Sequence, residues 1–149
     1  MSGQEQGTLL RVLLWVMGVA MVAIGFYHLV GGLASVPGTG ELTGVGRATE
    51  DSRERFYNAI FIGYALAWIW VAREATIPLT AVNWLAGIFL VGGIGRLLSI
   101  LTAGWPHWFP NPLSALELVL PPIFFWLTGR ERRRRGDVTS AQPPGSTGT

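Results

Sequence analysis

Arg96 and Glu117 lie deep inside long apolar stretches of this sequence, and they are therefore the first candidates for chemistry. A charge inside an apolar membrane segment costs about 2.5 to 3.5 kcal/mol and indicates a functional site by default. Arg96 lies near the end of one stretch and Glu117 near the start of the next. In helices that rise about 1.5 Å per residue, each group lies about 8 Å from the loop between them. We therefore predict that the two form a pair, because a guanidinium and a carboxylate can neutralise each other through two hydrogen bonds.

Further polar side chains are expected at the same level of the molecule. Pro121 and Pro122 weaken helical hydrogen bonding to the carbonyls of Glu117 and Leu118, so this turn offers backbone acceptors as well as a carboxylate. The complete predicted cluster is Arg96, Glu117, His28, Asn58, Arg55, Tyr57 and Ser99. Two interpretations remain open: a structural clamp that ties the helices together, which ranks first, and a site that handles a ligand or a proton.

Other chemistries find little support in the sequence. His28, His107 and Glu117 match no metal-ligand spacing and the chain has no cysteine, so we expect no metal site. The loop sequence GTGELTG lacks the GK[ST] ending of a phosphate-binding loop. Neither GxSxG nor HExxH occurs, and we expect no catalytic residue and no cofactor.

Apolar helices must position these residues. Half of the 149 residues are hydrophobic and only 13% are charged, against about 25% in an ordinary soluble domain. Four apolar stretches predict an all-α membrane protein with four transmembrane helices in an antiparallel bundle, because a spanning helix needs about 20 apolar residues. The first stretch is too long for a cleaved signal peptide. The predicted transmembrane domain is 9–129, with helices at about 9–30, 53–72, 77–101 and 112–129, a short N-terminus 1–8, and a basic and then disordered tail 130–149.

Arginines set the expected orientation. Arg47, Arg53 and Arg55 lie in the first loop, whereas seven of the eleven arginines lie on the side that holds both termini. The positive-inside rule therefore predicts cytoplasmic termini and a multi-pass protein of the cell inner (plasma) membrane. Asp51, with Glu54 three residues later, is the expected N-cap of the second helix. Tryptophans lie near the predicted helix ends, as is typical of membrane interfaces.

Partners are indicated by the arginine run and by small residues. The run Arg130 and Arg132 to Arg135 directly follows the last apolar stretch, which is typical of contact with lipid headgroups. The lipid bilayer is thus the first expected partner, and no nucleic acid is expected. Small residues recur on the second and third helices at a spacing that lets helices approach closely. They are expected to pack inside the bundle, with a larger membrane complex or a homo-oligomer as the other use: Ala59, Gly63, Ala67, Gly92 and Gly95.

Several strings of this sequence resemble one family of membrane proteins. GFYHLVGG, ERFYNAIFIGYAL, GGIGRLLSILTAGWP and ELVLPP are similar to the pattern of small DoxX-like four-helix bacterial membrane proteins, within a group known only as a domain of unknown function. The resemblance covers about residues 9–127 and depends chiefly on Gly95-Arg96 and on Glu117 with Pro121-Pro122. It implies a four-helix bundle of the inner membrane, and it brings no catalytic or binding residue with it.

Three function classes remain open at this point. The first is an accessory or helper subunit of a larger membrane assembly, since no reaction motif is present. The second is a binder or carrier of a small hydrophobic ligand, such as a lipid or a quinone-like molecule, with its polar site at the outer end of the bundle. The third is a DoxX-like membrane oxidoreductase component, which the resemblance permits and no residue requires. An enzyme therefore ranks last.

Overall fold

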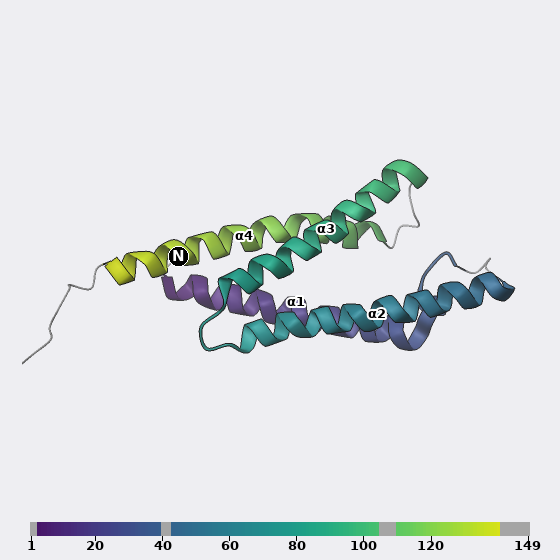
Figure 1. Cartoon of the computed structure of the whole chain (residues 1–149), viewed down its shortest axis with the longest axis horizontal. Coiled ribbons are helices and arrows are strands. Elements are labelled where there is room, and N and C mark those ends of the chain that lie inside the picture. Colours follow the sequence, from purple (N-terminus) through teal and green to yellow (C-terminus); the bar gives the residue numbers. More distant parts are fainter. Residues whose placement is uncertain (1–2, 40–42, 105–109, 141–149) are drawn as a thin grey trace, which may run out of the picture.

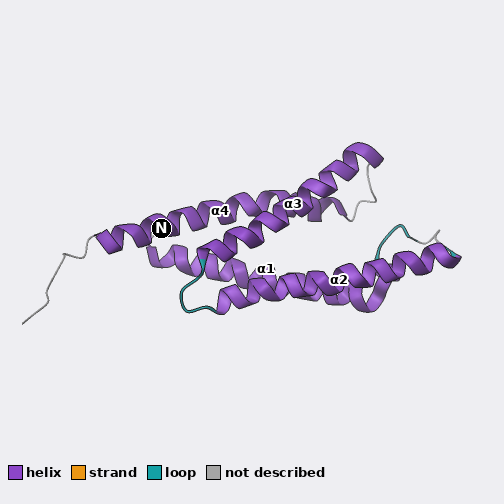
Figure 2. Ribbon diagram, viewed as in Figure 1, coloured by secondary structure: helices purple, strands orange, loops and turns teal. Residues whose placement is uncertain are grey.

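A computed structural model describes residues 3–39, 43–104 and 110–140 of the chain. Within these residues every regular element is a helix, as Figure 2 shows. The elements are α1 (Gly3–Gly31), the short 3-10 helix η1 (Gly32–Ser35), α2 (Gly44–Arg73), α3 (Leu79–Ala103) and α4 (Pro110–Ser140). The predicted all-α class is confirmed for this part of the chain.

The four long helices form two antiparallel hairpins, α1–α2 and α3–α4 (Figure 1). At one end α1 begins at Gly3, α2 runs through a short connection into α3, and α4 ends at Ser140. We call this the closed end, because the two hairpins meet near it. At the other end, the open end, α1 passes through η1 toward α2, and α3 is followed by α4. The hairpins diverge toward the open end (Figure 1).

The apolar core lies between the hairpins, on the side of the closed end. Trp68 of α2 and Phe124 of α4 are fully buried, with their ring centroids 4.8 Å apart. Around them the buried core comprises Leu10, Leu14, Met21, Ala65, Val71, Ala72, Ile77, Leu79, Val82, Leu85, Ala86 and Leu127. Most of these residues come from the closed-end halves of their helices, so packing joins the hairpins there and leaves their open-end halves apart.

Glycines determine how closely the helices approach within each hairpin. A Cβ added at Gly18 of α1 would lie 2.5 Å from Ile69 Cγ1 and 3.1 Å from the Ile69 backbone nitrogen on α2. In α3, a Cβ at Gly93 would lie 3.0 Å from Glu117 Cβ and 3.1 Å from the Glu117 carbonyl carbon on α4. A side chain at either position would push the backbones of the two helices apart.

The predicted small-residue faces behave differently. Gly63 of α2, and Gly92 and Gly95 of α3, are exposed, and a Cβ at any of them would meet no other atom within 4 Å. The expectation that these glycines pack helices inside the bundle is therefore wrong. Close packing uses Gly18 and Gly93 instead, which face a neighbouring helix.

Much of the surface is apolar. Two helical segments, Gly7–Ser35 and Leu79–Thr102, are long and apolar enough to cross a membrane by length and composition. The other two helices are as long, but polar residues interrupt them, such as Tyr57 and Asn58 in α2 and Glu117 in α4. Large apolar side chains remain exposed along all four helices. Contiguous exposed apolar surface of this kind is typical of lipid or partner contact.

Two helix boundaries differ from those expected. α2 begins at Gly44 with Thr43 at its N-cap position, so Asp51 lies inside the helix and is not its N-cap. α4 continues to Ser140, and residues 136–140 of the tail are therefore helical rather than disordered. Glu131 contributes to this extension, because its carboxylate accepts hydrogen bonds from arginines three and four residues later. The rest of the predicted tail, 141–149, lies outside the described residues.

Candidate functional site

Arg96 of α3 and Glu117 of α4 lie together in the structure. The Arg96 Nε donates a hydrogen bond to Glu117 Oε2 at 2.8 Å. Gly93, one turn before Arg96, brings the α4 backbone close enough for this contact. The Glu117 side chain is 8% exposed, whereas the Arg96 side chain is 44% exposed. The carboxylate is thus enclosed, and the guanidinium is half-exposed.

A second polar group lies at the open end of the other hairpin. His28, at the end of α1, has its Nδ1 2.7 Å from the Ser35 hydroxyl of η1 and 3.8 Å from the Glu54 carboxylate of α2. Asn58, one turn after Glu54, donates to that carboxylate at 2.8 Å. His28 and Asn58 therefore tie the end of α1 to the start of α2.

Arg55 and Asp51 complete this group. Asp51 Oδ1 accepts the Leu33 N–H at 2.8 Å, and Asp51 Oδ2 accepts Arg55 Nε at 2.8 Å. Arg55 also donates to the Leu29 carbonyl, at 2.7 Å, and to the Val30 carbonyl, so it satisfies the C-terminal carbonyls of α1. The hydrogen bonds from Arg55 and Leu33 lower the pKa of Asp51. This arrangement is a structural clamp at the turn between α1 and α2.

The predicted cluster is thus divided between the two hairpins. His28, Asn58 and Arg55 belong to the clamp on α1–α2, whereas Arg96 and Glu117 belong to α3–α4. Tyr57 and Ser99, the remaining members, are exposed on α2 and α3. The positions of these residues along their helices predict a common depth in the bundle. They do not predict that the two hairpins diverge at that depth.

The face of α2 that turns toward α3 continues into the open end. In the closed half, the Tyr64 hydroxyl donates to the Leu85 carbonyl of α3, and Trp68 packs on Phe124. Tyr57 and Phe61 precede Tyr64 by seven and three residues and so share its face. Tyr57 is exposed and continues this face toward the open end, whereas Phe61 is partly buried against the core and lies next to Gly25 of α1.

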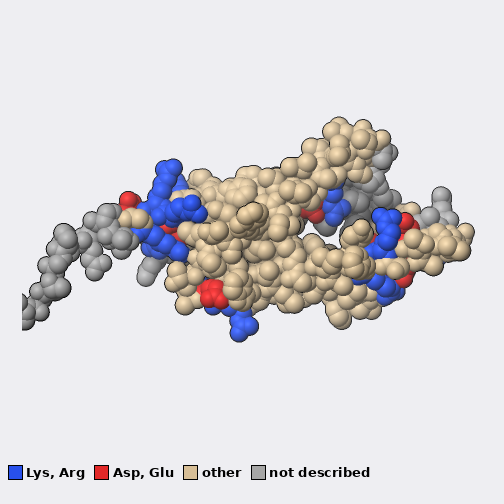
Figure 3. All heavy atoms as spheres, viewed as in Figure 1, with Lys and Arg blue, Asp and Glu red and all other residues tan. Residues whose placement is uncertain are grey.

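The opposing face of α3 carries the guanidinium. Leu85, which receives Tyr64, is followed on the same face by Phe89, Gly92 and Arg96 at intervals of four, seven and eleven residues. In Figure 3 the surface is hollowed between the two hairpins toward the open end, with arginine and acidic atoms on the α3–α4 side of the hollow. We call this hollow the open-end groove. By helical spacing, Tyr57 lies on the α2 face and Gly92 and Arg96 lie on the α3 face that turn toward this groove, and all three residues are exposed.

Tyr64 and Trp68 form contacts between the hairpins that the sequence interpretation missed. Trp68 was expected at a membrane interface, and the structure corrects this: it is fully buried, and its Nε1 has no hydrogen-bond acceptor among the described residues. Its ring lies edge-on to Tyr64, with centroids 6.2 Å apart. The signal in the sequence is the spacing of Tyr57, Phe61, Tyr64 and Trp68, which places four aromatic residues on one helical face.

No metal centre is formed by the residues that the structure describes. Groups of three or more His, Cys, Asp or Glu side chains that could hold an ion do not occur in 3–39, 43–104 and 110–140. His107, considered from the sequence, lies outside these ranges. What the site offers is an enclosed carboxylate, a half-exposed guanidinium and an exposed tyrosine, a set of groups that suits binding better than bond cleavage.

These features define the class of protein: an all-helical chain with helices apolar and long enough to cross a membrane. Within that class the chain belongs to the family described as Domain of unknown function (DUF4345), whose model matches residues 9–128. The family match includes α2 and α3 and most of α1 and α4, and it ends before the arginine run. No curated protein and no solved structure matches the chain.

Proposed function

We propose that this protein spans the cell inner membrane four times, with both termini in the cytoplasm, and binds an amphiphile in the open-end groove. The arginine distribution supports the orientation, because the closed end carries Arg11, Arg73 and the arginine run. The exposed apolar side chains on all four helices support contact with lipid. The resemblance to DoxX-like proteins agrees with a four-span bundle.

The half-exposed guanidinium of Arg96 is the observation that carries the binding proposal. Its Nε donates to the enclosed carboxylate of Glu117, and 44% of the Arg96 side chain remains exposed. A guanidinium has five N–H donors and no acceptor, so the donors that do not bind Glu117 favour a ligand that brings an acceptor. In an apolar setting that acceptor contributes more than it would in water. The ligand therefore carries a carbonyl, carboxylate or phosphate oxygen at its head.

The walls of the groove suit the body of such a ligand. Tyr57 offers exposed aromatic surface, and Gly92, four residues before Arg96, has open space around it. Planar or aliphatic groups pack well on aromatic side chains. A lipid or a quinone-like molecule meets both requirements. A role as a DoxX-like oxidoreductase component goes beyond the binding proposed here, since the groove itself contributes no redox-active residue.

A second function, as an accessory subunit of a larger membrane assembly, is favoured by a different observation. Gly63 on α2 and Gly95 on α3 face outward, and nothing occupies the space next to them. Exposed small residues let a helix from another chain approach closely. A partner subunit or a second copy of this chain would pack against these faces.

Ligand binding is tested with the purified full-length chain in detergent. A decyl-chain benzoquinone is titrated while its quenching of tryptophan and tyrosine fluorescence is measured. Arg96→Gln is expected to weaken binding at least tenfold, which corresponds to about 1.4 kcal/mol, and Tyr57→Leu by a smaller factor. Arg53→Gln, an arginine of the open end that pairs with Glu50, is the charge-matched control and should bind like the parent. Equal binding by the Arg96 variant would contradict the proposal.

The accessory role and the topology need separate measurements. A subunit that co-purifies with the parent chain in mild detergent should be lost from the Gly95→Leu variant. The Gly129→Leu variant, changed at another open position, should retain it. A C-terminal reporter that is active only in the cytoplasm should be active, and a Cys at Thr43 should react with an impermeant reagent added outside. The reverse labelling pattern would invert the orientation.

A further inference from the structure

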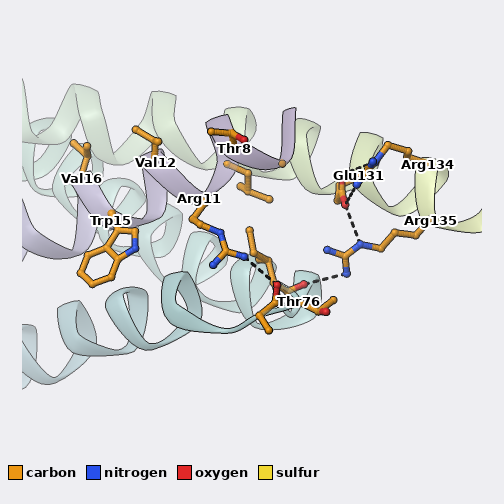
Figure 4. A pocket seen from close by; sticks show the side chains of 13 residues that line it. Thr8, Arg11, Val12, Trp15, Val16, Thr76, Glu131, Arg134 and Arg135 are labelled. Atoms are coloured by element: carbon orange, nitrogen blue, oxygen red, sulfur yellow. Dashed lines mark hydrogen bonds and ion pairs between the residues drawn. The ribbon is translucent and has the colours of Figure 1, made fainter. Parts of the chain in front are cut away.

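A separate pocket lies at the closed end, far along the helices from the open-end groove. Its volume is about 770 Å³, within the range of about 300 to 1,000 Å³ that is usual for ligand sites. Side chains of α1, the α2–α3 connection and α4 line it. Figure 4 shows Arg11 and Arg135 reaching toward each other from opposite sides, with Thr76 below them. Three parts of the chain thus form one site.

Positive charge dominates this pocket. Three guanidinium groups, from Arg11, Arg134 and Arg135, line it together with one carboxylate, that of Glu131. Glu131 accepts hydrogen bonds from Arg134 at 2.9 Å and from Arg135 at 3.0 Å, so one acid holds two arginines in position. The formal charges of these four residues sum to +2. The pocket is therefore suited to an anion.

Two of the arginines are also fixed by backbone carbonyls. Arg11 donates to the Ala72 and Ala75 carbonyls at 3.0 and 3.1 Å, and Arg135 donates to the Ile77 carbonyl at 3.1 Å. These bonds restrain the long side chains before any ligand arrives. Restraint of this kind favours binding, because less side-chain freedom is lost when the ligand is bound.

The remaining wall of the pocket is apolar. Val12, Trp15 and Val16 line it from α1 and are themselves exposed. In Figure 4 they follow α1 away from the guanidinium groups. A phospholipid site needs a charged part that binds the headgroup and, directly beside it, an apolar part that contacts an acyl chain. Tryptophan is enriched at the membrane interface, where such a site would lie.

We propose that the closed-end pocket binds one anionic phospholipid. Its phosphate lies between Arg11, Arg134 and Arg135, and an acyl chain follows Val12 and Val16 along α1. The inference rests on the proposed membrane span and is independent of ligand binding in the open-end groove. A free phosphate ion has the same head chemistry, but it would make no use of the apolar track.

Native mass spectrometry of the full-length chain, released from vesicles of equal parts phosphatidylglycerol and phosphatidylcholine, tests this proposal. The parent should retain one phosphatidylglycerol, and Arg134→Gln should lower that occupancy about tenfold. Arg133→Gln is the matched control, because it removes the same charge from the same run at a residue that does not line the pocket. Its occupancy should equal that of the parent.

A steric variant separates lipid loss from unfolding. Gly7 lines the pocket and has open space around it. Gly7→Leu keeps every charge and improves helix propensity, yet it should displace the lipid while leaving thermal stability in detergent unchanged. Equal losses for Arg133→Gln and Arg134→Gln would show diffuse attraction and overturn the proposal. Protection against heat by inorganic phosphate equal to that by phosphatidylglycerol would also overturn it, because the ligand would then be a free anion.

The readouts distinguish this inference from the proposed function. Phosphatidylglycerol retention depends on Arg134 and Gly7, whereas quinone binding depends on Arg96 and Tyr57. Loss of retention with normal quinone binding would reject only the lipid pocket. Recovery of the chain in the soluble fraction would instead reject the membrane span on which both rest.

Discussion

The closed and open ends of the molecule use arginine in different ways. At the closed end, Arg11 of α1 and Arg135 of α4 both donate to backbone carbonyls at or near the α2–α3 connection. Both hairpins are thereby bonded to residues at or near the α2–α3 connection. At the open end, Arg55 bonds within α1–α2 and Arg96 bonds within α3–α4. Charge therefore connects the hairpins at one end and only the helices of each hairpin at the other.

Packing follows the same division. Trp68 and Phe124 fill the space between the hairpins in the closed half. In the open half, the corresponding positions of α3 are Gly92 and Arg96, which provide little apolar surface to bury. The difference indicates how a small bundle can combine a packed core with an open groove: one half supplies the buried contacts between the hairpins, and the other half leaves the hairpins apart.

The largest effect is expected from removing the aromatic contact in the closed half. Phe124→Ala should lower the free energy of unfolding by about 3 to 5 kcal/mol, because it leaves a cavity against the fully buried Trp68. Phe56→Ala, at a phenylalanine of the open end that is 61% exposed, should change it by no more than about 0.5 kcal/mol. Unfolding in detergent measures both. Similar losses would mean that the two halves contribute equally, contrary to the comparison above.

The Arg96–Glu117 pair should give the next largest effect. Arg96→Met leaves the enclosed Glu117 carboxylate without its partner and should cost about 2 kcal/mol, less than the 3 to 5 kcal/mol of a fully buried pair because Arg96 is half-exposed. Glu117→Leu should cost less, since the exposed guanidinium can find water or lipid headgroups.

The double variant decides what the pair is for. Arg96→Met with Glu117→Leu removes both charges and should recover most of the lost stability in detergent. If it also binds the benzoquinone normally, the pair is a structural clamp only. If it folds but fails to bind, the pair belongs to the ligand site. Losses that simply add would show that the two groups do not interact.

The sequence was sufficient to predict local structure and depth. Long apolar stretches predicted four helices, and the matched distances of Arg96 and Glu117 from the α3–α4 loop predicted that they would meet. Both predictions depend on helical rise, which is a local property. The separation of His28 and Asn58 from this pair depends on the angle between the hairpins, which local periodicity does not determine.

Helix ends and the contacts of individual glycines were also harder to predict, because they too depend on tertiary contacts. Asp51 has the residue type and spacing of an N-cap, yet the Leu33 N–H and Arg55 are stronger partners in the folded chain. Gly93 packs against α4, whereas Gly92 and Gly95 beside it face open space, and their types are identical. Which glycine is used depends on the rotation of α3, and this is set by tertiary contacts.

Arg11 should show the smaller contribution of charge at the closed end. Arg11→Met removes two hydrogen bonds to the carbonyls of Ala72 and Ala75 and should cost about 1 to 2 kcal/mol. Arg73→Met, at an exposed arginine at the end of α2, is the matched control and should cost nothing measurable. If the two variants lose the same stability, the arginines act through net charge and not through the carbonyls.

The smallest effect should come from Glu131 and should depend on pH. Hydrogen bonds from Arg134 and Arg135 lower the pKa of Glu131 in the folded chain. A carboxyl whose folded pKa lies below its unfolded value, about 4.3, adds stability above that value and loses it as the pH falls through the folded pKa. Its arginine partners are exposed, so the pair is worth at most about 1 kcal/mol, or no more than about 4 °C in Tm. Glu131→Gln should therefore melt slightly below the parent at pH 7, and the two curves should converge as the pH approaches 3. Asp137→Asn, an exposed acid six residues later, controls for net charge, and a difference that persists unchanged at pH 3 would show that Glu131 acts through packing and not through its charge.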